Sequence, residues 1–198
     1  MPPTPSFAVK PTLVGQRVLL RPVAADDAVG LVEMLNDPEV RRLTGTRRQA
    51  RPGTELERAE QWYSSRSADE NRLDLAIVER HTNSYVGETV LNELDADNRS
   101  CSFRIALVGP RAFGRGYGTE ATRLILSHAF GTVGMHRVAL EVFAFNPRAR
   151  HVYEQVGFVH EGTKRQALHW QGDWIDAHIM AVLAEDWSAH CGYPTSGK

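Results

Sequence analysis

The order of apolar and polar positions divides the chain into alternating strands and helices. Period-two or continuous apolar stretches predict strands over residues 17–23, 73–79, 85–94, 100–108, 136–145, 164–170 and 174–183. Apolar residues three and four positions apart predict helices over 27–36, from Thr54 onward, over about 117–130, and up to Val156. No repeat or linker interrupts this order. It predicts one domain over 9–188, with loose tails at 1–8 and 189–198.

The connections between the predicted strands indicate the class of the sheet. Short turns join the strands over 73–79, 85–94 and 100–108, which is typical of an antiparallel meander. The strand over 136–145 is almost continuously apolar, so we expect both of its faces to be buried. Helices precede and follow that strand. We therefore expect an α/β (α+β) fold, with a mixed, mostly antiparallel sheet of about seven strands flanked by helices.

Local signals mark where some helices begin and end. Thr54 and Glu57 form the T-x-x-E pattern of a capping box. Asn146 is a suitable N-cap and Pro147 a suitable first residue of the helix that Gly157 ends. Between the first two helices, residues 41–51 (RRLTGTRRQAR) read as a polar loop with five arginines.

Composition narrows the function classes. The 198 residues are 42% hydrophobic and 24% charged, with a net charge of −1, which is ordinary for a globular protein and gives no reason to expect a nucleic-acid partner. Cys101 and Cys191 lack the spacing of a zinc site or a disulfide framework, so we expect no metal. There is no apolar leader and no 18-residue apolar run, and we expect a cytoplasmic protein without membrane contact.

The stretch PRAFGRGYGTEA, residues 110–121, places three glycines at alternate positions between a predicted strand and a predicted helix. A P-loop would need Lys-Ser/Thr where Arg115-Gly116 stands. A dinucleotide fingerprint fits the letters from Gly116 to Ala121, but the preceding meander is not the start of a Rossmann half. A glycine-rich turn without a ligand is a third alternative.

A fourth interpretation uses the whole context of the glycines. Where a strand ends in a glycine loop that opens a helix, successive N–H groups and the positive end of the helix dipole face one point. Glycine allows a pyrophosphate to lie against the main chain without meeting a Cβ atom. This interpretation predicts a site for a phosphate-bearing cofactor.

Three stretches together resemble a known family: FGRGYGTEA (113–121), NPRARHVYEQVGF (146–158) and GDWIDAHIMAVLAEDW (172–187). They are similar to the GNAT superfamily of acyl-CoA-dependent N-acyltransferases, and within it to ribosomal-protein N-terminal acetyltransferases of the RimJ/RimL type. The likeness spans about residues 15–187. Two positions depart from the family's patterns: Phe113 stands where Gln or Arg is frequent, and Ala149 where a serine is expected.

The resemblance implies a cofactor and its site. Acetyl-CoA would bind where the fourth and fifth strands splay apart, and a homodimer is common among such relatives. Pantetheine would pair with backbone near Leu107 and Val108, with Asn146 beside it and Arg150 in reach of a phosphate. The pyrophosphate would lie on the loop formed by Gly114, Arg115, Gly116, Tyr117, Gly118 and Thr119.

Amide formation from an amine needs a proton acceptor for the amine and a proton donor for the thiolate that leaves. Tyr153 matches the tyrosine that often acts as this donor in the superfamily, although a residue there can also simply contact the cofactor. Glu88 and, second, Glu93 are candidate bases; Asp176 and His178 are further candidates. Charged strand residues are more often solvated, which is the competing interpretation for all four.

The expected activity is acetyl transfer from acetyl-CoA to a primary amine, with a protein N-terminus favoured from the subfamily likeness alone. Alternatives are a small-molecule amine (aminoglycoside, polyamine or amino-acid derivative), a succinyl donor, a catalytically silent acyl-CoA-binding module, and a nicotinamide enzyme. The arginines of 41–51 would suit an acidic or phosphorylated acceptor, or form a solvated loop. Aromatic candidates for the acceptor wall, each as easily part of the core, are Trp62, Tyr63, Trp170 and Trp174.

Overall fold

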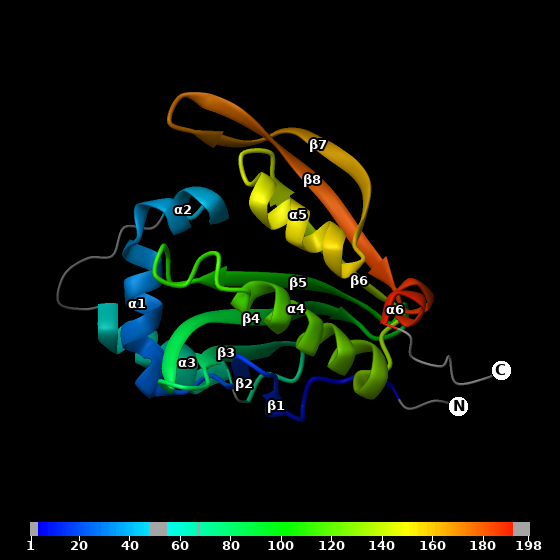
Figure 1. Cartoon of the computed structure of the whole chain (residues 1–198), viewed down its shortest axis with the longest axis horizontal. Coiled ribbons are helices and arrows are strands. Elements are labelled where there is room, and N and C mark those ends of the chain that lie inside the picture. The colour runs from blue at the N-terminus through cyan, green and yellow to red at the C-terminus, as the bar shows by residue number, and fades with distance from the viewer. Residues whose placement is uncertain (1–3, 48–54, 67, 192–198) are drawn as a thin grey trace.

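Eight strands form one mixed sheet in the computed structural model, which describes residues 4–47, 55–66 and 68–191 (Figure 1). The strands are β1 (Leu13–Val14), β2 (Val18–Pro22), β3 (Leu73–Glu79), β4 (Ser84–Asp95), β5 (Ser100–Leu107), β6 (Arg137–Phe143), β7 (Val159–Trp170) and β8 (Asp173–Leu183). Their order across the sheet is β1-β2-β3-β4-β5-β6-β8-β7. Every neighbouring pair is antiparallel except β5 and β6, so the mixed, mostly antiparallel sheet is confirmed.

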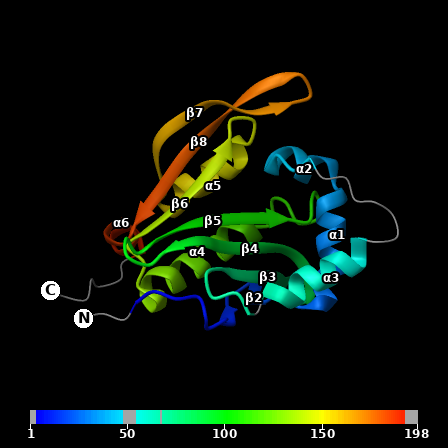
Figure 2. The same ribbon diagram turned by 180° about the vertical axis from the view of Figure 1, so that it is seen from behind.

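Helices cover both faces of this sheet. They are α1 (Ala28–Asn36), α2 (Pro38–Thr44), α3 (Glu55–Arg66), α4 (Tyr117–His128), α5 (Pro147–Val156) and α6 (Ala184–Cys191), with a short 3-10 turn before α1 and a π turn after α4. The two views show α4 and α5 on one face and α3 on the other, beside β2 and β3 (Figure 2). None of the helices in the described ranges has the length and apolarity needed to span a membrane.

The central feature of the sheet is the separation of its two parallel strands. β5 and β6 pair only from Ser100 to Ser102, opposite Arg137 to Ala139. Beyond these three positions the strands diverge, as the figures show, and α5 lies beside the opening (Figure 1). Backbone groups along the facing edges of the two strands therefore have no strand partner there.

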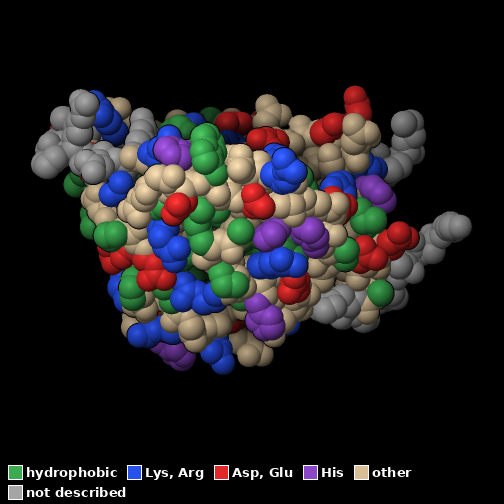
Figure 3. Space-filling view, turned by 90° about the horizontal axis from the view of Figure 1, so that it is seen from above, with side chains coloured by type: hydrophobic (Ala, Val, Ile, Leu, Met, Phe, Trp, Pro, Cys, Tyr) green, Lys and Arg blue, Asp and Glu red, His purple; other side chains and the backbone are tan. Residues whose placement is uncertain are grey.

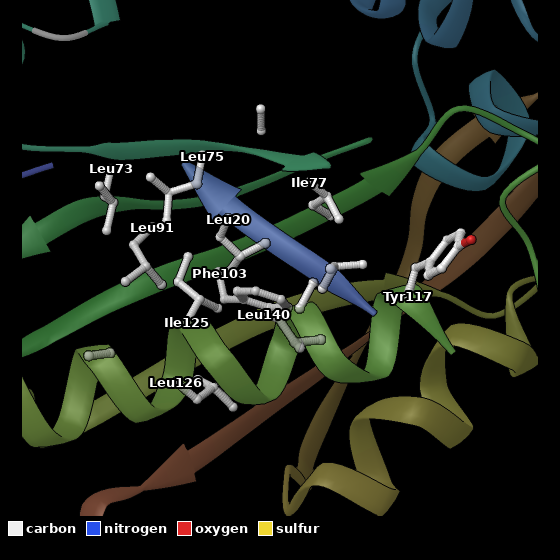
Figure 4. Packing of buried hydrophobic residues seen from close by; sticks show 14 of the residues in the cluster. Leu20, Leu73, Leu75, Ile77, Leu91, Phe103, Tyr117, Ile125, Leu126 and Leu140 are labelled. Atoms are coloured by element: carbon white, nitrogen blue, oxygen red, sulfur yellow. The ribbon is translucent and has the colours of Figure 1, made fainter. Parts of the chain in front are cut away.

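The core lies between the sheet and α4. Leu20 of β2, Leu75 of β3 and Leu91 of β4 lie on the side of the sheet that faces Ile125 of α4, and all four side chains have 0% exposure (Figure 4). Burying one such side chain contributes about 1.5–3 kcal/mol. Phe7 is also fully buried and its N–H donates to the carbonyl of Glu70. The packed chain therefore begins before residue 9, within the segment expected to be a loose tail, and α6 continues to Cys191.

Four local expectations differ from the structure. Residues 41–44 are the last turns of α2 rather than a loop, because Asp37 caps that helix and Pro38 begins it. Buried and more exposed side chains alternate along β6, which is therefore not buried on both faces, and Glu141 is exposed. β7 begins five residues earlier than the predicted strand over 164–170. β1, an additional strand of two residues, is too short to show a period. Thr54 and part of the arginine-rich stretch lie outside the described residues.

Candidate active site

A cavity of about 470 Å³ occupies the space between the separated strands. Its wall is made by α2, β4, β5, the glycine loop with the start of α4, β6 and α5. The lining residues are Val40, Leu43, Thr44, Glu88, Val90, Phe103, Arg104, Ile105, Ala106, Leu107, Ala112, Phe113, Gly114, Gly116, Tyr117, Gly118, Thr119, Glu141, Val142, Phe143, Asn146, Arg148, Ala149, Val152 and Tyr153. The cavity therefore brings together residues of the glycine stretch (110–121) and of the stretch over 146–158.

The glycine loop forms one end of this cavity. Gly114 and Gly116 have φ angles of +72° and +80°, in the left-handed region that favours glycine. Gly118 is different, because it lies in the first turn of α4 and a Cβ atom there would come no nearer than 3.7 Å to Leu107. The fold itself therefore has room for a side chain at Gly118. The first N–H groups of a helix also lack acceptors within the helix.

Side chains from distant segments hold this loop in place. Arg111 donates to both carboxylate oxygens of Glu33 in α1, at 2.6 and 2.8 Å, and to the carbonyl of Tyr85. Arg17 donates to the carbonyl of Arg115 at 2.9 Å. The guanidinium group of Arg111 is thus engaged by hydrogen bonds within the protein. Arg17, in contrast, is exposed and places a positive charge beside the loop.

Glu88 lies in the cavity wall on β4, and its carboxylate accepts a hydrogen bond from a chain of two tyrosine hydroxyl groups. The fully buried Tyr63 of α3 donates its hydroxyl hydrogen to Glu88 Oε2 at 2.7 Å. The hydroxyl groups of Tyr63 and Tyr85 are 2.9 Å apart. Because the Tyr63 proton points to Glu88, Tyr85 is the donor in this second bond. Burial raises the pKa of the Glu88 carboxyl above its usual range, and the hydrogen bond from Tyr63 opposes that rise.

Glu93 lies elsewhere. It is exposed, has a φ of +54°, and falls where the register between β4 and β5 shifts. Its carboxylate accepts a hydrogen bond from Ser102 at 2.5 Å. Asp176 accepts from the N–H of Gln166, and His178 contacts Thr163 and Arg150. Of the four sequence candidates for a base, only Glu88 lines the cavity.

Tyr153 reaches the cavity from α5, on the side opposite to Glu88's strand. Its ring packs edge-on against Phe103 and Phe158, with ring centroids 6.2 and 5.8 Å away. Burial raises the pKa of its hydroxyl, which therefore stays protonated at neutral pH. Within the described part of the chain this hydroxyl has no hydrogen-bond partner. The geometry thus presents an unengaged proton donor to the cavity.

The remaining candidates divide into those that line the cavity and those that do not. Asn146 lines it and also caps α5, because its Oδ1 accepts the N–H of Ala149 at 3.1 Å. Leu107 lines the cavity. Val108 does not, because it is buried and its N–H donates to the carbonyl of Val86. Arg150 pairs with Glu154 at 2.9 Å outside the lining. Arg115 contributes its carbonyl to Arg17.

Sequence reasoning missed two features of this site. Tyr63 was treated as a wall or core residue, not as the partner of Glu88. Arg104 was not considered, although its position in the strand over 100–108 put it near the predicted site. The β4–β5 register pairs Glu88 with Ala106 and Val90 with Arg104, which places Arg104 diagonally across from Glu88. Pairing these two predicted strands at the correct register would have found it.

The residues present fit acetyl-CoA on two observations. The Gly118 position leaves space that a Cβ would fill and that the fold does not use. The start of α4 directs N–H groups into the same end of the cavity, which suits a pyrophosphate. Among residues 4–47, 55–66 and 68–191, no cluster of three His, Cys, Asp or Glu side chains is arranged to hold a metal ion.

Comparisons with known proteins agree with this geometry. The family model described as Acetyltransferase (GNAT) domain matches residues 17–159. Spermidine N(1)-acetyltransferase of Vibrio cholerae is 30% identical over 107 residues, which cover 54% of this chain and 61% of that enzyme. A putative ribosomal N-acetyltransferase of Bacillus subtilis is 28% identical over 120 residues, 61% of this chain and 64% of that protein.

A solved structure extends the likeness over the fold. The crystal structure of spermidine N-acetyltransferase from Vibrio cholerae in complex with CoA and spermine superposes with a TM-score of 0.76 at 22% identity. The match covers 87% of this chain and 99% of that chain. At this identity the likeness establishes the fold alone.

Proposed function

The chain belongs to the acetyltransferase (GNAT) family, and we propose that it transfers the acetyl group of acetyl-CoA to the primary amine of a small molecule. One observation carries the proposal. A single cavity holds a glycine loop suited to a pyrophosphate at one end, and Glu88 and Tyr153 in the walls of the same space. Fold alone would not distinguish an enzyme from a binding module, but a partly buried carboxylate and an unengaged hydroxyl suit proton transfer.

The residues of the loop bind and orient the cofactor in this proposal. Backbone N–H groups of Tyr117, Gly118 and Thr119 would hold the pyrophosphate, and Leu107 and Asn146 would contact the pantetheine arm. When bound, acetyl-CoA supplies an acetyl group activated as a thioester. Unpaired backbone N–H groups along β5 beyond Ser102 would stabilise negative charge on the reacting carbonyl oxygen.

Two side chains move protons. Glu88 takes a proton from the acceptor's ammonium group, directly or through one water, so that the free amine can attack the thioester carbon. The C–N bond would form first, giving a tetrahedral adduct, and the C–S bond would break second. Tyr153 would give its proton to the departing sulfur and regain one from the nitrogen, which loses its second proton as the amide forms. The raised pKa of the Glu88 carboxyl suits this role, because a base works best when its pKa is near the working pH.

The relatives bear on the choice of acceptor. Relatives named as spermidine acetyltransferases support a small molecule. The relative described as a putative ribosomal N-acetyltransferase keeps a protein N-terminus as the second candidate, which the RimJ/RimL likeness had favoured. These two acceptors differ in a measurable way, because a short peptide with a free N-terminus would serve as substrate only in the second case.

The test begins with calorimetric titration of the protein with acetyl-CoA, succinyl-CoA and NAD. We expect acetyl-CoA to bind and NAD not to bind. Release of CoA thiol is then followed with small amines and with short peptides as acceptors. Binding of acetyl-CoA with no thiol release from any acceptor would indicate a silent binding module, and binding of NAD alone would overturn the assignment of the loop.

A further inference from the structure

The charged side chains in the cavity wall differ in whether they have an ion-pair or hydrogen-bond partner. Four of them line it, namely Glu88, Arg104, Glu141 and Arg148. Glu88 accepts from Tyr63, Glu141 pairs with Lys164, and Arg148 pairs with Glu39 at 3.7 Å. Arg104 makes no ion pair or hydrogen bond through its side chain in the part of the chain that the structure describes. Among the charged side chains of the described cavity lining, Arg104 is thus the exposed one without a partner.

Arg104 faces the side of the sheet on which Glu88 lies. Glu88 pairs with Ala106, and Arg104 lies two positions before Ala106 in β5, on the same face. Such diagonal neighbours lie about 7–8 Å apart, within reach of long side chains. The guanidinium group is close enough to lower the pKa of the Glu88 carboxyl electrostatically. The amine that Glu88 would deprotonate therefore arrives beside a fixed positive charge.

A cation at this point is unfavourable for an acceptor that carries only ammonium groups, because like charges repel. A carboxylate on the acceptor reverses the sign of the interaction, since the fork of a guanidinium group matches both oxygens of a carboxylate. On the face shown in Figure 3, cationic and anionic side chains are interspersed, so this face has no single sign of charge that would offset the repulsion. Charge selection would then be made inside the cavity.

We propose that Arg104 binds a carboxylate on the acceptor, and that the acceptor is therefore an amino acid or a similar amine whose carboxylate lies close to the reacting nitrogen. This inference rests on the proposed function and deepens it. The amine meets Glu88 of β4 while the carboxylate meets Arg104 of β5. The cofactor's phosphates are served by the glycine loop, at the far end of β5 beyond Leu107.

The test compares each amino acid with the amine that remains when its carboxylate is removed. The pairs are phenylalanine and 2-phenylethylamine, histidine and histamine, and ornithine and 1,4-diaminobutane. The quantity measured is the ratio of kcat/KM within each pair, for wild type, Arg104→Gln and Arg104→Lys. Intrinsic reactivity cancels when the ratios of two proteins are compared. Arg123→Gln, an exposed arginine on α4 outside the cavity lining, is the matched control.

We expect wild type to favour the amino acid in at least one pair, and Arg104→Gln to reduce that preference by roughly 10- to 100-fold. Arg104→Lys should fall between the two, and Arg123→Gln should match wild type. The affinity for acetyl-CoA should be the same in all four proteins.

Acetylation of the diamine but of no amino acid would overturn this inference and leave the proposed function intact. So would an equal loss for both members of a pair, or a large loss of acetyl-CoA affinity in Arg104→Gln. Failure of wild type to bind acetyl-CoA would instead remove the proposed function itself.

Discussion

Gly118 offers the sharpest test of the cofactor site, because alanine there should affect folding and binding in opposite directions. In the first turn of α4 its φ is not left-handed, and a new Cβ atom would meet Leu107 at 3.7 Å, an ordinary contact. Alanine in place of glycine within a helix stabilises a protein by up to about 0.5–1 kcal/mol. The free energy of unfolding should therefore stay the same or rise slightly.

Binding should weaken at the same time. The Cβ atom would stand where a pyrophosphate must approach the N–H groups that begin the helix. Loss of one hydrogen bond to a charged group costs about 1.5–3 kcal/mol, which corresponds to a roughly 10- to 150-fold rise in Kd for CoA. Gly116 is a poorer site for this test, because its φ of +80° makes any side chain strained whether or not a ligand binds.

The assay needs two measurements on each of three proteins. Urea unfolding followed by circular dichroism gives stability, and calorimetric titration gives Kd for CoA. Gly131→Ala is the matched control, since a Cβ atom there would meet nothing within 4 Å and Gly131 lies in the turn after α4, outside the cavity lining. A stable Gly118→Ala protein that binds CoA as tightly as wild type would refute the placement of the phosphates.

Two further predictions concern proton transfer. Tyr153→Phe should lower kcat by roughly 100-fold or more while Kd for CoA stays unchanged; unchanged turnover in stopped-flow or steady-state assays would remove Tyr153 from the chemistry. Tyr63→Phe removes the hydrogen bond that lowers the pKa of Glu88, so the acidic limb of the pH profile of kcat/KM should move to higher pH, with a smaller shift for Tyr85→Phe, which acts through Tyr63. An acidic limb that stays in place in both variants would mean that Glu88 is not the group that titrates.

The parts of the site that local sequence determines were predictable. A strand end, closely spaced glycines and a helix start within a dozen residues predicted the glycine loop. The helix that Asn146 caps predicted that Tyr153 is buried, whereas its candidacy as a proton donor came from the family resemblance alone. The start of α2 is a local signal that the sequence prediction did not use: Asp37 followed by Pro38 is an N-cap and a first helical residue, and a helix begins there.

What the sequence did not predict depends on long-range pairing. Tyr63 and Glu88 are 25 residues apart, on a helix and a strand whose contact no periodicity reveals. Arg104 could not be predicted for the same reason: it is a candidate because it has no partner among the described residues, and only the long-range arrangement of the chain shows that. An exposed arginine on a strand is ordinary until the structure shows that the other three charged residues around the cavity are already paired or hydrogen-bonded.

The alternation of β5 links the stability of the fold to the chemistry of the site. Both residues line the cavity, but from opposite faces of β5: Phe103, at 2% exposure, packs against the ring of Tyr153, whereas Arg104, the next residue, lies on the face of Glu88. A shift of one residue in the β4–β5 register would exchange these two side chains. It would bury a guanidinium group without a partner, at a cost of several kcal/mol, and would withdraw the aromatic support of Tyr153. The hydrophobic core therefore fixes the same register that sets Glu88, Arg104 and Tyr153 around one space, so a variant that loosens the core at Phe103 should lose acceptor selectivity together with stability.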